Sequence, residues 1–85
     1  MKKNLIVTLD AYSDFINDLT ENTNYMVFVS SLDDIASIKY FTVRVKDELS
    51  TRLDCMLYNR ENGKTYCGMF YYDEYDGVVR VYIKE

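Results

Sequence analysis

The sequence predicts an α+β domain built around a four-stranded antiparallel meander over residues 38–46, 51–61, 64–75 and 78–84. Apolar and polar residues alternate along these stretches, which is typical of half-buried strands. The dipeptides Asn62-Gly63 and Asp76-Gly77 separate the last three stretches. Both tolerate the positive φ angles of a two-residue hairpin turn. The length of 85 residues is enough for a single domain, 1–85, with one modest core.

The N-terminal part of the chain predicts a strand, a helix and a second strand that extend the meander. Residues 4–8 alternate as a short strand, and Ala11, Phe15 and Leu19 recur at the spacing of one helical face. Residues 25–29 are apolar on both sides, which predicts a central or covered strand rather than an exposed edge. We expect the helix to pack on one face of the sheet.

The segment between this unit and the meander begins with Ser31, followed by Asp34 at the third position. A serine oxygen and a carboxylate satisfy the free N–H groups of a first helical turn, which predicts a short helix through Ala36. The alternation that follows predicts the first strand of the meander, with Tyr40 and Arg44 on its polar side.

Two-residue turns would fix the register of the last three strands. Asp73 would then lie opposite Arg80, and Tyr71 opposite Tyr82, so that opposite charges and like rings meet across the strands. A three-residue loop at 48–50 would join the first two strands. A register slip of one residue would exchange the two faces of a strand, so the two turns together sort the residues by face. The predicted core face contains Leu53, Cys55, Leu57, Tyr66, Phe70, Tyr72, Val79, Val81 and Ile83.

The opposite face of the meander is the candidate binding site. Its tyrosine, methionine and arginine side chains are types that are enriched in protein–protein interfaces. It adjoins an acidic hairpin tip, where carboxylates can imitate phosphates and a ring can stand in for a stacked base. The predicted partner-binding residues are Tyr40, Arg44, Met56, Tyr58, Met69, Tyr71, Asp73, Glu74, Tyr75, Asp76, Arg80 and Tyr82. The alternatives are that the segment 31–36 or the N-terminus covers this face, or that its tyrosines only line a solvated sheet.

The two cysteines, Cys55 and Cys67, fall on opposite faces of the sheet in this register, so a disulfide between them would require rearranged strands. A five-residue loop between their strands would instead place them directly across from each other. We expect two free thiols, consistent with a reducing compartment. With two cysteines and no histidine, we expect no metal site.

Catalytic signatures are missing from the sequence. Histidine is absent, which removes the commonest general base, and each of the carboxylate clusters lies at a turn or a helix start. We therefore expect a protein that is not an enzyme and has no cofactor. The net charge of −4 argues against tight nonspecific binding to nucleic acid or to anionic membranes. Asp10 interrupts the first apolar run before it reaches the length of a signal peptide, so we expect a cytoplasmic protein of the host cell.

In composition the chain resembles the small, acidic, Asn- and Tyr-rich accessory proteins of phages and mobile elements, which include anti-CRISPR and anti-restriction inhibitors. The resemblance implies a non-catalytic inhibitor that blocks a nucleic-acid-binding partner with a basic surface. One alternative is a self-associating structural module or homodimer. Another is a single-stranded nucleic-acid binder that stacks bases on the sheet tyrosines, although direct nucleic-acid binding is opposed by the charge.

Overall fold

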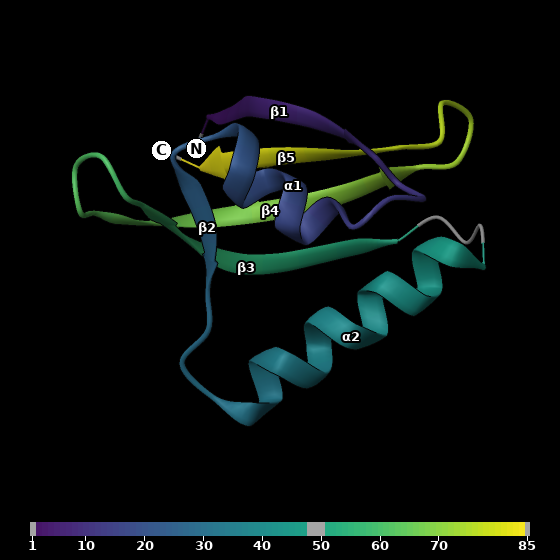
Figure 1. The fold of residues 1–85 in the computed structure, drawn as a ribbon, viewed down its shortest axis with the longest axis horizontal. Coiled ribbons are helices and arrows are strands. Elements are labelled where there is room, and N and C mark those ends of the chain that lie inside the picture. Colours follow the sequence, from purple (N-terminus) through teal and green to yellow (C-terminus); the bar gives the residue numbers. More distant parts are fainter. Residues whose placement is uncertain (1, 48–50, 85) are drawn as a thin grey trace.

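The structure is a computed structural model that describes residues 2–47 and 51–84. A strand, a helix, a strand and a longer helix precede three consecutive strands (Figure 1). These elements are β1 Lys3–Asp10, α1 Phe15–Asn22, β2 Tyr25–Phe28, α2 Leu32–Lys46, β3 Arg52–Asn59, β4 Thr65–Asp73 and β5 Val78–Lys84.

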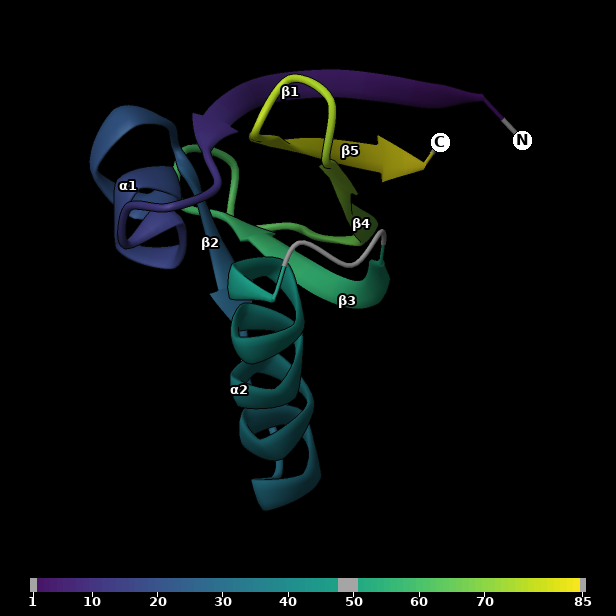
Figure 2. The same cartoon turned by 90° about the vertical axis from the view of Figure 1, so that its right-hand side faces the viewer.

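The five strands form one antiparallel sheet in the order β1-β5-β4-β3-β2. The α+β class and the antiparallel sheet are thus confirmed, but the meander has three strands, β3, β4 and β5. The N-terminal unit adds β1 to one edge and β2 to the other, so the prediction of a central or covered position for β2 is wrong. Figure 2 shows that the sheet is curled and that α1 lies on the open side of the curl.

Helix α2 replaces the predicted short helix and the predicted first strand of the meander. The Ser31 side chain accepts a hydrogen bond from the Asp34 N–H at 3.2 Å, as expected, but the helix continues to Lys46. Its last turn carries Arg44 and Lys46, which interact favourably with the carbonyl end of a helix. Tyr40 and Arg44 therefore lie on a helix and not on the sheet. The predicted loop at 48–50 lies outside the described residues.

Both hairpin turns are longer than predicted. In the β4–β5 turn, Asp73 pairs with Val78, and its Oδ1 accepts hydrogen bonds from the N–H groups of Tyr75 and Asp76 at 2.9 and 3.3 Å. Gly77, at a φ of 66°, donates its N–H to the Asp73 carbonyl at 2.9 Å. The β3–β4 turn is built in the same way from Asn59 and Gly63. The side-chain caps thus stabilise four-residue turns, 60–63 and 74–77, instead of the predicted two-residue turns.

These turns shift both registers by two residues from the prediction. Tyr71 lies opposite Arg80 rather than Tyr82, and Leu57 lies opposite Tyr66 rather than Gly68. Because side chains alternate along a strand, an even shift leaves every residue on its predicted face. The core face is accordingly retained: Leu57, Phe70, Tyr72, Val79, Val81 and Ile83 are buried, and Leu53, Cys55 and Tyr66 pack against them.

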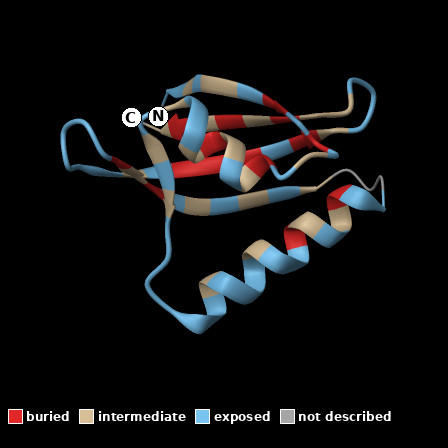
Figure 3. Cartoon of the chain, viewed as in Figure 1, coloured by how far each residue is buried: buried red, intermediate tan, exposed pale blue. Residues whose placement is uncertain are grey.

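The core joins both helices to the inner face of the sheet through three phenylalanine rings. Phe15 of α1 and Phe41 of α2 meet edge to face with ring centroids 5.8 Å apart, and each also contacts Phe70 of β4, at 6.3 and 6.0 Å. Aromatic pairs at such separations contribute about 0.5–1.5 kcal/mol each beyond the area they bury. Buried residues along α2 are confined to its C-terminal half, as the colours in Figure 3 show.

Gly68 of β4 has no side chain, so the buried side chain of Leu57 occupies the space above the Gly68 backbone. A Cβ atom at position 68 would lie 2.6 Å from Leu57 Cδ1, and Leu57 has no exposed surface into which it can move. We expect Gly68→Ala to lower the free energy of unfolding by about 1–3 kcal/mol, because the core would be overpacked. Urea denaturation measures this change, and Cys67→Ala, at the exposed neighbouring position, is the control. An unchanged midpoint for Gly68→Ala would contradict the close contact.

Candidate protein-binding surface

The outer face of the sheet, turned away from both helices, carries most of the predicted binding residues. We define this outer face by the side chains of β3, β4 and β5 that alternate with the core residues. They are Arg52, Asp54, Met56, Tyr58, Cys67, Met69, Tyr71, Asp73, Arg80, Tyr82 and Lys84. Because the described helices pack on the inner face, the alternative of a face covered by residues 31–36 is wrong.

Exposure along the outer face is uneven. Met56 and Tyr71 are each 40% exposed, whereas Tyr58 and Tyr82 are half-buried. Met69 is buried, so it supports the face rather than contributing surface to it. Met56, Tyr71 and their half-buried neighbours therefore provide the apolar contact area.

The edge strands widen the outer face with residues that were not predicted as site residues. Met26 and Phe28 of β2 lie opposite Tyr58 and Met56, and Leu5 of β1 lies opposite Tyr82. Directly opposed residues of antiparallel strands point to the same side, so all three belong to the outer face, and all three are exposed. The apolar residues on both sides of the stretch 25–29 could have indicated that Met26 and Phe28 belong to the outer face. This pattern was instead interpreted as a sign of burial.

The charges of the outer face are paired within it. Asp54 binds the Arg52 guanidinium at 3.0 Å and the Lys84 ammonium at 3.4 Å, and the Lys3 ammonium lies 5.5 Å from the centre of the Tyr82 ring. Exposed pairs of this kind contribute little to stability. Among the described residues of the outer face, these pairs leave no row of unpaired cations for a phosphate backbone.

The acidic tip between β4 and β5 is partly neutralised. The Arg80 guanidinium binds Asp73 at 2.6 Å and Asp76 at 2.8 Å, and its hydrogen bond lowers the pKa of Asp73 below the usual range. Tyr75 is 93% exposed, and Glu74 is exposed beside it. The tip therefore presents a ring and one carboxylate outside the Arg80 ion pairs.

Tyr40 and Arg44 are separated from the other predicted residues. On α2, Tyr40 is exposed, and the Arg44 guanidinium lies 5.8 Å from the centre of its ring. The helix packs on the inner face, so these two side chains do not join the tyrosines of the outer face.

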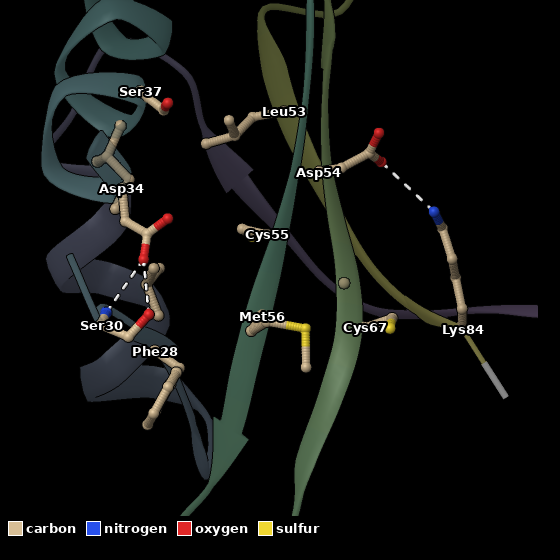
Figure 4. Close-up of a pocket in the computed structure, with 13 residues that line it drawn as sticks. Phe28, Ser30, Asp34, Ser37, Leu53, Asp54, Cys55, Met56, Cys67 and Lys84 are labelled. Carbon is tan, nitrogen blue, oxygen red and sulfur yellow. Dashed lines mark hydrogen bonds and ion pairs between the residues drawn. The ribbon is translucent and has the colours of Figure 1, made fainter. Parts of the chain in front are cut away.

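A groove of about 460 Å³ separates the N-terminal half of α2 from β2 and β3 (Figure 4). Val27, Ile38, Leu53 and Cys55 supply its apolar walls. At its rim, the Asp34 carboxylate accepts hydrogen bonds from the Ser30 N–H and hydroxyl, both at 3.0 Å, and these bonds lower its pKa. The hydrogen bonds of the Asp34 carboxylate thus fix the start of α2.

No described group of residues suggests metal chemistry or a membrane span. Over residues 2–47 and 51–84, no three His, Cys, Asp or Glu side chains come together where they could hold a metal ion. Over the same ranges, neither helix is long and apolar enough to cross a bilayer.

Comparisons of the chain with protein-family models, with curated proteins and with solved structures found no match.

The thiols of Cys55 and Cys67 should differ in reactivity. Both are free, but Cys55 faces the core side, where burial, together with the charge of Asp54, raises its pKa to about 12, whereas Cys67 is exposed on the outer face. Because the thiolate is the reactive species, we expect iodoacetamide at pH 8 to label Cys67 and to leave Cys55 unmodified. Peptide mass spectrometry measures the site. Equal labelling of both cysteines in the folded protein would contradict this placement, and labelling in urea is the control.

The ion pair between Asp73 and Arg80 should make stability depend on pH. The pKa of Asp73 is lowered in the folded protein, so its contribution is present above the unfolded value of about 3.9 and is lost as the pH falls below it. We expect the midpoint of thermal unfolding to fall less between pH 5 and pH 2 in Asp73→Asn than in the wild type. The asparagine keeps the turn cap, as Asn59 does in the other hairpin. Glu74→Gln is the control, and parallel profiles for wild type and Asp73→Asn would exclude the effect.

Proposed function

We propose that the chain is a non-catalytic protein-binding module whose outer face contacts a partner protein. The observation that carries the proposal is a five-stranded sheet with helices on one face only, which leaves Met56, Tyr71 and Phe28 exposed on the other. Rigid rings bury area at low entropic cost, and flexible thioethers adapt to the shape of a partner, so both are common in interfaces. Exposed apolar patches on small proteins commonly mark such contacts.

The charge distribution favours a protein over a nucleic acid as the direct partner. The chain carries a net charge of −4, and the cations Arg52 and Lys84 on the outer face are already paired with Asp54. Nonspecific nucleic-acid binding depends on cations that neutralise phosphates and release counterions. Stacking on Tyr71 alone would lack this contribution.

The acidic tip indicates the chemistry of the partner. The Ala11 N–H donates to the Gly77 carbonyl at 3.1 Å, which brings the end of β1, with exposed Asp10, beside the tip with Glu74 and Tyr75. This end of the molecule adjoins the outer face. It would fit a basic groove that otherwise binds nucleic acid, with the Tyr75 ring placed where a base would stack. The function we propose is therefore that of a small acidic inhibitor of the anti-CRISPR or anti-restriction class, acting in the host cytoplasm.

Phage plating tests this function directly. We expect the chain, expressed in bacterial strains with defined CRISPR or restriction systems, to raise the plating efficiency of a targeted phage in at least one strain. Hot-spot truncations cost about 1–2 kcal/mol or more each, so Met56→Ala/Tyr71→Ala should need at least about tenfold more protein for the same effect. Plating efficiency at several expression levels measures the difference.

Two controls make this result specific. Glu21→Ala changes an exposed residue of α1 on the opposite side of the sheet and should leave plating unchanged. Thermal unfolding of the double variant establishes that it remains folded. Unchanged plating in every strain would contradict the inhibitor function, and full activity of the folded double variant would contradict the outer face. Salt-dependent binding to a labelled single-stranded oligonucleotide, measured by anisotropy, would favour the nucleic-acid alternative.

A further inference from the structure

Strand β3 has an open edge over residues 52–55. On one side, β4 pairs with β3 from Arg52 to Tyr58. On the other side, β2 pairs only with residues 56–59 and ends at Phe28, after which the chain leaves the sheet and forms α2 (Figure 1). Within residues 2–47 and 51–84, no strand pairs with 52–55 on that side. Half of β3 is therefore a short sheet edge between the end of β2 and α2.

The pairing identifies the main-chain groups that face this edge. The Asn59 N–H donates to the Lys64 carbonyl, toward β4, at 2.8 Å. The Arg60 N–H donates to the Asn24 carbonyl, toward β2, at the same distance. Because these directions alternate along an antiparallel strand, the N–H and C=O groups of Asp54 point to the side of β2 and meet the open edge. In the described part of the chain no strand reaches them, and such groups are a template for an added strand.

The groove between α2 and the sheet follows this open edge. Its lining residues come from both faces of β3, namely Leu53 and Cys55 from the inner face and Asp54 and Met56 from the outer face. This is the arrangement expected where a strand has no neighbour on one side. Across the groove, Ile38 of α2 adds an apolar wall. The groove thus combines free main-chain groups with space for side chains.

We propose that the open edge of β3 binds an extended peptide segment, which adds to the sheet as a strand antiparallel to β3 and in line with β2. In this mode of recognition, main-chain hydrogen bonds provide affinity, and pockets for alternate side chains provide specificity. Directly opposed residues point to the same side of a sheet. Peptide residues opposite Cys55 and Leu53 would therefore point toward α2, where Val27 and Ile38 provide apolar contacts. The residue opposite Asp54 would point outward.

Charge in the groove favours a basic peptide residue opposite Cys55. Asp34 of α2 lines the groove, and Figure 4 shows one of its oxygens directed toward β3. Its Oδ2 accepts both hydrogen bonds from Ser30, which lower its pKa and keep the carboxylate ionised at neutral pH. Lys84 also lines the groove, but it is bound to Asp54 at 3.4 Å. A peptide lysine can lay its aliphatic stem along the apolar wall and bring its ammonium to Asp34.

This site is small and distinct from the proposed partner contact. Four residues of a strand span about 13 Å, so we expect a dissociation constant on the order of 100 micromolar for a short peptide. Tyr71, which carries the proposed contact of the outer face, does not line the groove. The inference therefore does not rest on the proposed function.

Titration of the full chain with the pentapeptide Lys-Thr-Val-Thr-Val, blocked at both ends, tests the inference. In the proposed register its lysine lies opposite Cys55 and its first threonine opposite Asp54. We expect the backbone amide NMR signals of residues 52–56 and 34–38 to shift, and those of α1 to stay in place. An absence of shifts at several millimolar peptide would overturn the proposal.

N-methylated peptides test whether the peptide adds as a strand. A methyl group on the first threonine nitrogen removes the donor that faces the Asp54 carbonyl and should raise the dissociation constant at least about tenfold. A methyl group on the first valine nitrogen, which faces away from β3, is the matched control and should have little effect. Equal binding of the two N-methylated peptides would exclude strand addition and overturn the proposal.

Proline tests the same hydrogen bonds from the side of the protein. Asp54→Pro removes an N–H that faces the open edge and leaves the pairing with β4 intact, so it should weaken peptide binding at least about tenfold. Asp54→Ala loses the same carboxylate but keeps the N–H, and it should bind like the wild type. Thermal unfolding establishes that the proline variant is folded. Full binding by folded Asp54→Pro would contradict the proposal.

A charge exchange tests the role of Asp34. The wild type should bind the lysine peptide about fivefold more tightly than Glu-Thr-Val-Thr-Val. Asp34→Asn keeps an oxygen for Ser30 but removes the charge, so it should bring this ratio close to one. Asp33→Asn makes the same change at an exposed position of the same turn, outside the groove, and should keep the ratio. An unchanged ratio in Asp34→Asn would overturn the selection of a basic residue.

Two further measurements separate the peptide from other occupants and surfaces. Tyr71→Ala should leave peptide binding unchanged, and loss of binding in this variant would place the peptide on the outer face and overturn the proposal. Sedimentation equilibrium of the full chain should show no association through the edge. A concentration-dependent mass that Asp54→Pro abolishes and Asp54→Ala does not would assign the edge to a second copy of the chain instead.

Discussion

The contact of Phe15, Phe41 and Phe70 determines which surfaces of this molecule are covered. Each ring comes from a different element, α1, α2 and β4, and the centroids lie 5.8 to 6.3 Å apart. The cluster holds both helices on the inner face of the sheet and anchors α2 near its C-terminal end. The outer face and the projecting half of α2 therefore remain exposed as a consequence of where the core is formed.

The misassigned strand at residues 38–46 has a physical explanation in α2 itself. Phe41 and Val45 occur both in a two-residue alternation, with Val43, and in a helical spacing, with Ile38. Val43 is apolar although it is exposed. The sequence of α2 therefore lacks the continuous polar face by which an amphipathic helix is recognised. The Ser31 cap and the basic last turn were visible signals, but the choice between helix and strand depended on the contact of Phe41 with Phe15, which is not a local property.

Much of the candidate site followed from side-chain alternation alone. Both turns were predicted two residues too short, yet Met56, Tyr58, Tyr71 and Tyr82 share one face, because an even register shift preserves sides. The caps at Asn59 and Asp73 could have indicated four-residue turns. The contribution of β2 could not be predicted, since the pairing of Phe28 with Met56 joins segments far apart in the sequence and follows no local pattern.

The edge strands β1 and β2 favour association through side chains over association through backbone. An exposed edge strand is a template for pairing with another chain, and proteins blunt such edges with bulges, charge or shortness. The pairing of β1 with β5 shifts between Leu5 and Val7, and Lys3 lies at the start of the same edge. At the other edge, β2 is only four residues long. Strand addition is therefore disfavoured along β1 and β2. The outer face offers contacts between side chains, and because Met56 and Tyr71 are already exposed there, a partner can be bound without disturbing the core.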